Sequence, residues 1–321
     1  MNQTRPADFS LGIVIPCYNE EEVIPKLVAE LDRFAASVPY PVRVLFIDDG
    51  SRDRTCELLH EACRSHPNFA FLRFSRNFGH QTGVTAGLAH IRGEVIGVID
   101  ADLQDPLDVL GEMVGEWRKG NDVVYGIRKN RKEGVLLRFA YASFYRILKK
   151  MANIEIPLDS GDFCVMDRRV VDVINAMPEH NRFIRGMRGW VGFKQHGHPY
   201  ERLARAAGQP KYNLSRLMKL AFDGIISFST VPLRLATLLG LAAGGLGLVY
   251  LLVVIITKIV NPAAPLGWAS TVAVVIFLGG AQLVVLGIIG EYLGRIFEES
   301  KRRPLFLVER TDGWLREDGT S

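Results

Sequence analysis

Two stretches near the carboxyl end of the chain contain no charged side chain, and they constrain the fold more than any other feature. They cover residues 235–257 and 268–290. A helix rises about 1.5 Å per residue, so each stretch is long enough to cross a hydrocarbon layer roughly 30 Å thick. Buried core helices are the alternative, but such helices rarely remain uncharged over this length. The sequence therefore predicts a water-facing domain followed by two transmembrane helices.

Basic residues flank the two predicted spans on one side of the membrane. The short turn between the spans offers only Lys258, whereas several lysines and arginines precede the first span and follow the second. Because positive residues favour the cytoplasmic face, we expect a multi-pass protein of the inner membrane with its catalytic domain and both termini in the cytoplasm. The flanking residues are Arg216, Lys219 and Arg234 before the first span and Arg295, Lys301, Arg302 and Arg303 after the second.

The composition agrees with one large domain ahead of the spans. Roughly the first 230 residues are enough for a sizeable core. The formal charge of +4 is not gathered into a long basic run, which argues against a dedicated nucleic-acid binder and is compatible with attraction to anionic lipid. The amino terminus shows no signal-peptide pattern. The four cysteines lack metal-binding spacing, so we expect reduced, packed thiols.

Short apolar runs alternate with helical patterns along this domain. Such alternation is typical of an α/β fold with a mostly parallel sheet covered on both faces. Ligands of these sheets bind at the carboxyl ends of the strands, so the residues directly after each strand are candidates for function. The predicted strands are 11–16, 42–48, 69–75, 95–100 and 122–125, and the predicted helices are 21–36, 53–65, 80–91 and 107–119.

The turns after the first three predicted strands are polar. The first turn, Pro16-Cys17-Tyr18-Asn19-Glu20, lacks both the GxGxxG pattern of a dinucleotide-dependent dehydrogenase and the Gly-rich, basic character expected of a nucleotidyltransferase. The second, Asp48-Asp49-Gly50-Ser51, offers carboxylates to a base or ribose, although Ser51 or Asp53 can instead cap the next helix. The third leads into a polar run containing His80 at a helix N-terminus, where backbone N–H groups favour anions.

The fourth predicted strand delivers Asp100 and Asp102 to the edge of the sheet. Two carboxylates that emerge from one buried strand repel each other unless a cation lies between them. A bound Mg²⁺ or Mn²⁺ would relieve that repulsion and neutralise a departing nucleoside diphosphate. The alternative is a pair of ordinary turn-forming aspartates ahead of a helix that starts near Pro106.

Together with Ser160-Gly161-Asp162-Phe163, these motifs resemble those of a known family. The motifs and their order along the chain are similar to those of the inverting glycosyltransferases of family 2, which have the GT-A fold. The two C-terminal spans make the chain resemble, within that family, the polyisoprenyl-phosphate glycosyltransferases. The likeness is greatest to the bactoprenol glucosyltransferases of the GtrB type and more distant to dolichyl-phosphate mannose synthase. The QxxRW signature of processive synthases is missing, which favours transfer of a single sugar. The motifs are Pro16-Cys17-Tyr18-Asn19-Glu20, Asp48-Asp49-Gly50-Ser51, Asp100-Ala101-Asp102-Leu103-Gln104-Asp105-Pro106 and Ser160-Gly161-Asp162-Phe163.

The resemblance implies roles for individual residues. It makes Asp162 the family's proposed catalytic aspartate, and it makes Asp100 and Asp102 the metal ligands, with Mg²⁺ or Mn²⁺ as cofactor. A lipid monophosphate acceptor has a second pKa near ~6, so it hardly needs a general base, and Asp162 can instead orient the acceptor, a basic side chain or the sugar. The residues implied to bind the nucleotide sugar are Pro16, Tyr18, Glu20, Asp49, Asp100 and Gln104.

Basic residues after the catalytic strands are candidates for binding the acceptor phosphate. Arginine suits bidentate phosphate binding, and the alternative for each residue is a solvated basic surface near anionic lipid. Arg128 follows the fifth predicted strand, and Lys211 lies in a segment that resembles the family's mobile loop. The four candidates are Arg128, Arg131, Arg138 and Lys211.

The sequence predicts four segments: a GT-A catalytic domain at 1–213, an amphipathic interfacial helix at 214–230, two transmembrane helices at 231–292 and a cytoplasmic tail at 293–321. A second amphipathic helix is expected at 135–151, although either amphipathic segment can pack on the sheet instead. Residues 304–308 have the composition of a strand but are isolated from the other predicted strands. We therefore expect this strand to pair with a sheet edge of another subunit, which predicts a homo-oligomer such as a tetramer. We expect disorder after Arg310.

These interpretations predict an enzyme that moves a single hexose, glucose from UDP-glucose, onto a polyprenyl phosphate such as undecaprenyl phosphate at the cytoplasmic leaflet. The alternative is a non-catalytic membrane component, such as a partner of a lipid-linked sugar flippase that has kept a glycosyltransferase shape. The retained Asp100, Asp102 and Asp162 argue against that alternative.

Overall fold

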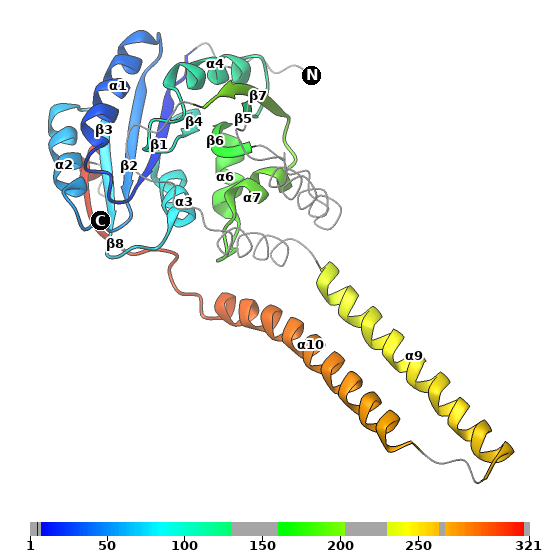
Figure 1. Ribbon diagram of the computed structural model, residues 1–321. Coiled ribbons are helices and arrows are strands. Elements are labelled where there is room, and N and C mark those ends of the chain that lie inside the picture. The colour runs from blue at the N-terminus through cyan, green and yellow to red at the C-terminus, as the bar shows by residue number, and fades with distance from the viewer. Residues whose placement is uncertain (1–4, 6–7, 130–159, 203–229, 263–266, 318–321) are drawn as a thin grey trace. The chain divides into compact units, whose positions relative to one another are not determined.

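A computed structural model of the chain describes residues 5, 8–129, 160–202, 230–262 and 267–317 (Figure 1). The chain forms two compact units. The first comprises residues 1–149, 154–213 and 303–321, and the second comprises residues 150–153 and 214–302. The predicted amphipathic helix at 135–151 lies outside the described residues, as does all but the last residue of the one at 214–230.

The first unit is built on one eight-stranded sheet with the order β7-β5-β6-β4-β1-β2-β3-β8. Strand β1 pairs in parallel with β2 and β4, β2 with β3, and β5 with β7, whereas β6 runs antiparallel to β4 and β5, and β8 antiparallel to β3. The sheet is therefore mixed, although its central strands are parallel as predicted. The strands are β1 (Leu11–Cys17), β2 (Val42–Asp48), β3 (Phe69–Phe74), β4 (Val95–Val98), β5 (Val123–Lys129), β6 (Ser160–Asp167), β7 (Gln195–Glu201) and β8 (Val308–Gly313).

Helices cover both faces of this sheet (Figure 1). One apolar cluster joins the sheet to α1 (Ile24–Ser37), α2 (Thr55–Ser65) and α4 (Leu107–Arg118). The opposite cluster joins it to α3 (His80–His90), α6 (Arg168–Ala176), α7 (Ile184–Trp190) and α11 (Trp314–Glu317). Helix α1 presents an apolar stripe to the sheet, formed by Ile24, Leu27, Leu31 and Phe34.

The central strands are apolar on both faces because helices cover both. All seven residues of β1 are buried, and their side chains alternate between the two apolar clusters. Helix α3 lies especially close to β1, since a Cβ added to Gly87 would overlap the Val14 side chain. This close approach sets the position of the α3 N-terminus, where His80 lies.

The predicted strands and helices up to residue 125 agree with the described elements to within a few residues. Strands β6 and β7 and helices α6 and α7 were not predicted. In β7 only Tyr200 is buried, and the strand carries two histidines, a glycine and a proline, so its composition does not indicate a strand.

The C-terminal tail contradicts two expectations. The strand lies at Val308–Gly313 instead of 304–308, and it pairs with β3 of the same chain, so no second subunit is needed to supply an edge. The residues after Arg310 are not disordered throughout, because Trp314 and Leu315 are buried in the core. Because β8 has a mainly polar sequence, its composition does not indicate a strand. The buried pair that follows it, Trp314 and Leu315, anchors it to the core.

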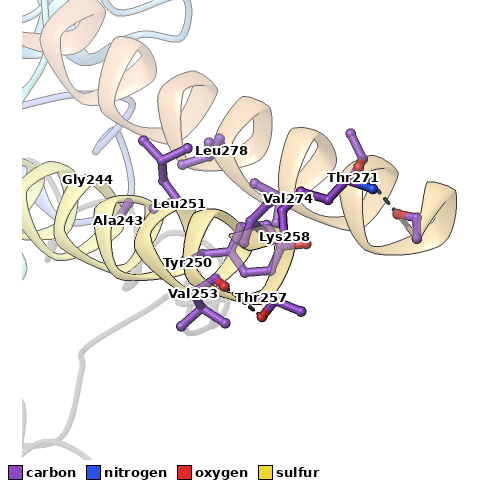
Figure 2. Close-up of a pocket in the computed structure, with 13 residues that line it drawn as sticks. Ala243, Gly244, Tyr250, Leu251, Val253, Thr257, Lys258, Thr271, Val274 and Leu278 are labelled. Carbon is purple, nitrogen blue, oxygen red and sulfur yellow. Dashed lines mark hydrogen bonds between the residues drawn. The ribbon is translucent and has the colours of Figure 1, made fainter. Parts of the chain in front are cut away.

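The second unit contains α9 (Val231–Val260) and α10 (Trp268–Ser300). Both are long and apolar enough to cross a membrane, with mean hydropathies of 2.5 and 2.6. At most 6% of either span is buried, which distinguishes them from core helices of a soluble protein. Glycines on α9 leave a hollow of ≈ 660 Å³ beside α10, which Figure 2 shows lined by Gly244, Leu251, Val274 and Leu278.

The close approach of α3 to β1 predicts a difference between two helical glycines. Gly87→Ala should lower the free energy of unfolding by about 1–3 kcal/mol, because the added methyl group overlaps Val14. Gly115→Ala on α4 adds a methyl group with nothing within 4 Å, and should be neutral or stabilising by up to about 1 kcal/mol. Thermal unfolding of the two purified variants in detergent tests this, and equal melting temperatures would contradict the close packing.

The buried tail predicts that its anchor matters for stability. Trp314→Ala should cost about 3–5 kcal/mol, because Trp314 is 8% exposed in the core. Leu307→Ala is the control: Leu307 is 54% exposed, so its truncation should change stability by less than about 0.5 kcal/mol. Limited proteolysis with mass mapping should detect faster cleavage near the C-terminus in Trp314→Ala alone. Equally rapid cleavage of the tail in wild type and in both variants would restore the expectation of a disordered tail.

Candidate active site

The topology of the sheet brings seven strand ends to one edge. Strands β1 to β4 end there. Strand β6 runs antiparallel to β4 and therefore begins there, which brings Asp162 to the same edge as the residues that follow β4. Strands β5 and β7 are parallel to each other and antiparallel to β6, so their last residues, including Arg128 and Tyr200, reach this edge as well. The candidate active site is this edge.

Hydrogen bonds tie the turn after β1 to the turn after β2. The backbone N–H of Asn19 donates to Ser51 Oγ at 3.0 Å, and that of Glu20 donates to Thr55 Oγ1 at 2.8 Å. Asp53 accepts from the backbone N–H groups of Glu21 and Thr55, so it fixes the start of α2 and the neighbouring turn. Tyr18, 40% exposed, stands at the end of β1, where its ring is available to a ligand.

Asp49 anchors the turn that precedes α3. Its two carboxylate oxygens accept the backbone N–H groups of Phe78 at 2.6 Å and Gly79 at 2.9 Å. Burial raises the pKa of Asp49 above its usual value, against the opposing effect of these two hydrogen bonds. Asp49 therefore shapes the entrance to α3, and its nucleotide-binding role stays a prediction.

Asp100 and Asp102 converge on one cation. Nη2 of Arg202, the residue directly after β7, lies 3.5 Å from Asp100 Oδ2 and 3.6 Å from Asp102 Oδ2. Asp102 Oδ1 also accepts the backbone N–H of Gln104 at 3.1 Å, across Leu103 in the left-handed region at φ 55°. Burial raises the pKa of Asp100, and the nearby carboxylates add to this effect.

Asp162 is the most heavily paired carboxylate of the edge. Arg185 of α7 donates to both of its oxygens, from Nε at 2.8 Å and from Nη2 at 3.2 Å. His80 Nε2 lies 3.2 Å from Oδ2, and the Gln81 amide donates to the same oxygen at 3.1 Å. Burial alone would raise the pKa of Asp162, but the charge of Arg185 and the hydrogen bonds hold it far below its usual range.

His80 connects Asp162 to the Asp100 side of the site. Its Nε2 lies 3.8 Å from Asp100 Oδ1, and its side chain is 44% exposed. Partial burial disfavours the charged ring, but the hydrogen bond and the charge of Asp162 outweigh burial and raise the pKa of His80. The carboxylate of Asp162 therefore shifts His80 toward its imidazolium form.

Asp105 is a further carboxylate of the edge. It is 3% exposed and accepts a hydrogen bond from the Tyr200 hydroxyl at 2.6 Å. Arg128 Nε lies 3.4 Å from the same hydroxyl, and its guanidinium packs against Gly161, where a Cβ would lie 2.9 Å from Nη2. Arg202 Nε lies 3.5 Å from Asp105 Oδ1. Arg128 and Arg202 thus enter the site from two adjacent strands.

The residues at the edge fit a divalent metal ion whose remaining ligands are water and substrate oxygens. Among the described residues, no group of three or more His, Cys, Asp or Glu side chains is arranged to hold a metal. Asp100 and Asp102 nevertheless face one point where a cation already lies. Mg²⁺ typically takes one or two carboxylates and completes its shell with water and substrate phosphates. Gln104 lies beside these carboxylates and offers an amide oxygen.

The structure assembles most of the described residues that the sequence singled out. Tyr18, Glu20, Asp49, Gln104, Asp100, Asp102, Asp162 and Arg128 lie in or beside the strand ends of this edge. Pro16 lies within β1 beneath Gly83 of α3, so its ring faces the interior. Arg131, Arg138 and Lys211 lie outside the described residues.

Sequence reasoning did not select four side chains that contact the site carboxylates: Gln81, Arg185, Tyr200 and Arg202. Gln81 follows His80 in a polar run that was noticed at a helix N-terminus. The other three follow β6 along the chain, in a region where no strand or helix was predicted. A predicted β7 would have drawn attention to Tyr200 and Arg202 as residues at a strand end.

Comparison with known proteins places the chain in a family. Residues 12–174 match the model of glycosyl transferase family 2, and residues 231–296 match the GtrB C-terminal hairpin. The chain is 43% identical to the uncharacterized glycosyltransferase YkcC of Bacillus subtilis over 94% of both chains. It is 38% identical to the prophage bactoprenol glucosyl transferase homolog of Escherichia coli, over 94% of this chain and 98% of the relative. It is also 38% identical to the bactoprenol glucosyl transferase of Shigella phage SfV, over 93% of this chain and 98% of the relative.

The mixed α/β sheet, the acidic residues at its edge and the two apolar C-terminal helices agree with both family matches. The chain is a glycosyltransferase that belongs to family 2, and with its C-terminal hairpin it is a member of the GtrB-like group.

Proposed function

We propose that the protein transfers one glucose unit from UDP-glucose to a polyprenyl phosphate, such as undecaprenyl phosphate, with inversion at the anomeric carbon. The observation that carries this proposal is the convergence of Asp100 and Asp102 on one cation at the strand ends, on a chain that also has two apolar helices of spanning length. The names of the bactoprenol glucosyl transferase relatives support glucose and a polyprenyl acceptor.

The donor would lie across the ends of β1, β2 and β4. Exposed Tyr18 suits stacking on a base, and the turns carrying Glu20 and Asp49 are held in place by hydrogen bonds. In our proposal Tyr18, Glu20, Asp49, Asp100 and Gln104 line the nucleotide-sugar site, and Pro16, whose ring faces the interior, supports the strand end beneath it.

Asp100 and Asp102 would hold Mg²⁺ or Mn²⁺, with Gln104 beside them. A divalent ion there would neutralise the charge that develops on the departing diphosphate. The two carboxylates would orient that diphosphate, and the cationic side chains around them would add to its stabilisation.

Asp162 would act through its neighbours instead of removing a proton. Its carboxylate is paired with Arg185, and its low pKa makes it a poor proton acceptor. A lipid monophosphate, with a second pKa near ~6, is already a nucleophile at neutral pH. We therefore assign to Asp162 the positioning of Arg185 and His80 at the site of transfer.

The acceptor phosphate would dock against cations that face this edge. Arg128, beside Asp162 at Gly161, is the described candidate. We retain Arg131, Arg138 and Lys211 as further candidates from the sequence. The helices α9 and α10 would anchor the protein in the inner membrane as a multi-pass protein with both termini cytoplasmic. The flanking basic residues support this orientation.

The segment boundaries 1–213, 214–230, 231–292 and 293–321 remain our proposed division of the chain. A homo-oligomer also remains a proposal, although its original support, a strand without a partner, no longer applies because β8 pairs with β3. A non-catalytic role in a lipid-linked sugar pathway is disfavoured by the assembled acidic edge. The transfer assay below distinguishes the two roles.

The proposed reaction predicts that Asp102→Asn lowers sugar transfer at least about a hundredfold, since metal-assisted charge stabilisation contributes several kcal/mol. Asp108→Asn is the control, because Asp108 is an exposed acid in the first turn of α4. The assay supplies purified full-length protein in detergent with polyprenyl phosphate, a divalent ion and a panel of radiolabelled nucleotide sugars, followed by lipid extraction. Equal transfer by both variants, or no labelled lipid with any donor, would overturn the proposed function.

The Asp162–Arg185 pair predicts a pH-dependent stability. Asp162→Asn should lower the free energy of unfolding at pH 7 by about 3–5 kcal/mol, because it leaves a partly buried Arg185 without its carboxylate. A carboxylate with a depressed folded pKa stabilises above its unfolded pKa of about 3.9 and loses this effect as pH falls. The difference between wild type and Asp162→Asn should therefore shrink below about pH 4.

Denaturant unfolding at several pH values measures this difference. Arg185→Gln and the Asp162→Asn/Arg185→Gln double variant complete a thermodynamic cycle, in which the double variant should be much less destabilised than the sum of the singles. Additive losses would contradict the pairing. A general-base role would instead receive support if Arg185→Gln kept full transfer activity while Asp162→Asn lost it.

A further inference from the structure

Arg202 occupies the centre of the acidic cluster formed by Asp100, Asp102 and Asp105. Its Nη2 lies 3.5 Å from Asp100 and 3.6 Å from Asp102, and its Nε lies 3.5 Å from Asp105. Its side chain is 24% exposed, and that of Asp105 is fully buried. One guanidinium therefore lies between three carboxylates and reduces their mutual repulsion.

The contacts are long for arginine–carboxylate pairs. Charge-assisted N–H···O bonds are typically about 2.7–2.9 Å, whereas each of these separations is at least 3.5 Å. Arg202 Nε and Asp105 Oδ2 are buried and have no hydrogen-bond partner among the described residues. Arg202 is thus shared by the three carboxylates and forms no close bidentate pair with any of them. Such weak contacts allow another cation to replace Arg202.

The remaining contacts of Asp105 allow such an exchange. The Tyr200 hydroxyl donates to Asp105 Oδ1 at 2.6 Å, independently of Arg202. If Arg202 moves away, Asp105 keeps this hydrogen bond. Asp100 and Asp102 would lose their shared cation, and a divalent ion would replace it.

We propose that Arg202 is a built-in counter-ion of the metal site, which opposes binding of the free metal ion and is displaced when the ion arrives with a nucleoside diphosphate. The diphosphate then supplies a new anionic partner for the displaced guanidinium. Free metal ions compete with Arg202 without offering that compensation. Metal and nucleotide therefore strengthen each other's binding, and by linkage the coupling is reciprocal.

This inference rests on the proposed function, and metal binding tests it separately from transfer. Electron paramagnetic resonance of free Mn²⁺, titrated into full-length protein in detergent with and without UDP, gives the two affinities. In wild type, UDP should strengthen Mn²⁺ binding by more than about tenfold. Arg202→Gln should bind Mn²⁺ alone at least about tenfold more tightly than wild type, because a competing charge within several Å is gone, and should show a smaller enhancement by UDP.

Two further variants make the result specific. Arg33→Gln removes the same charge from a residue with a 70% exposed side chain that pairs with Glu30, and should leave both affinities unchanged. Arg202→Lys keeps a cation and should remain closer to wild type than Arg202→Gln. Arg202→Met, which also removes the charge, replaces Arg202→Gln should that variant fail to fold. In chelator-treated buffer Arg202→Gln should also melt lower than wild type, and Mn²⁺ should raise its melting temperature by more.

The possible outcomes separate the inference from the proposed function. If wild type binds Mn²⁺ with UDP but Arg202→Gln binds Mn²⁺ alone no more tightly than wild type, the counter-ion role is wrong and the proposed function stands. If Arg33→Gln matches Arg202→Gln, a general charge effect replaces the specific one and the inference fails. If no variant binds Mn²⁺ under either condition, the metal-assisted function fails together with the inference.

Discussion

The charge balance at the carboxyl edge of the sheet is the constraint on which the site depends. Asp100, Asp102, Asp105 and Asp162 are half-buried or buried, and desolvated carboxylates persist only when paired. The pairing groups come from separate elements: His80 from α3, Arg185 from α7 and Arg202 from the end of β7. These elements must therefore be in place before the carboxylates can approach one another, so the electrostatics of the site and the packing of the flanking helices are coupled.

One antiparallel strand makes this arrangement possible. In a wholly parallel sheet, each strand contributes its last residues to the functional edge, as β2 and β4 do with Asp49 and Asp100. Strand β6 runs the other way and contributes its first residues, which brings Asp162 opposite the end of β4. The reversal also lets β5 and β7 run parallel to each other beyond β6, so that Arg128 and Arg202 approach the acids from a different side than Tyr18.

The sequence predicted the parallel half of the sheet because its strands are continuous apolar runs between amphipathic helices. It singled out Asp49, Asp100 and Asp102 for the same reason, since ligands of such sheets bind at the carboxyl ends of the strands. Residues after 160 were harder to predict: β7 and β8 lack apolar patterns, and their pairing depends on edges made by distant segments. The sequence did not indicate Arg185 and Arg202, because their role depends on the carboxylates that they contact in the folded chain. Neighbouring residues in the sequence do not predict those contacts.

The proposed reaction explains why basic side chains stand among the carboxylates at this edge. Both substrates would be anionic: the donor through its diphosphate, the acceptor through its phosphate. A phosphate nucleophile needs little help in losing a proton but must be brought close to a second anion. Asp162 is held as an ion-paired carboxylate, and Arg185 and Arg128 lie beside it. This arrangement suits that task better than proton abstraction. Mutual repulsion of the two substrates, more than weak nucleophilicity, is then the barrier that this arrangement of side chains is suited to lower.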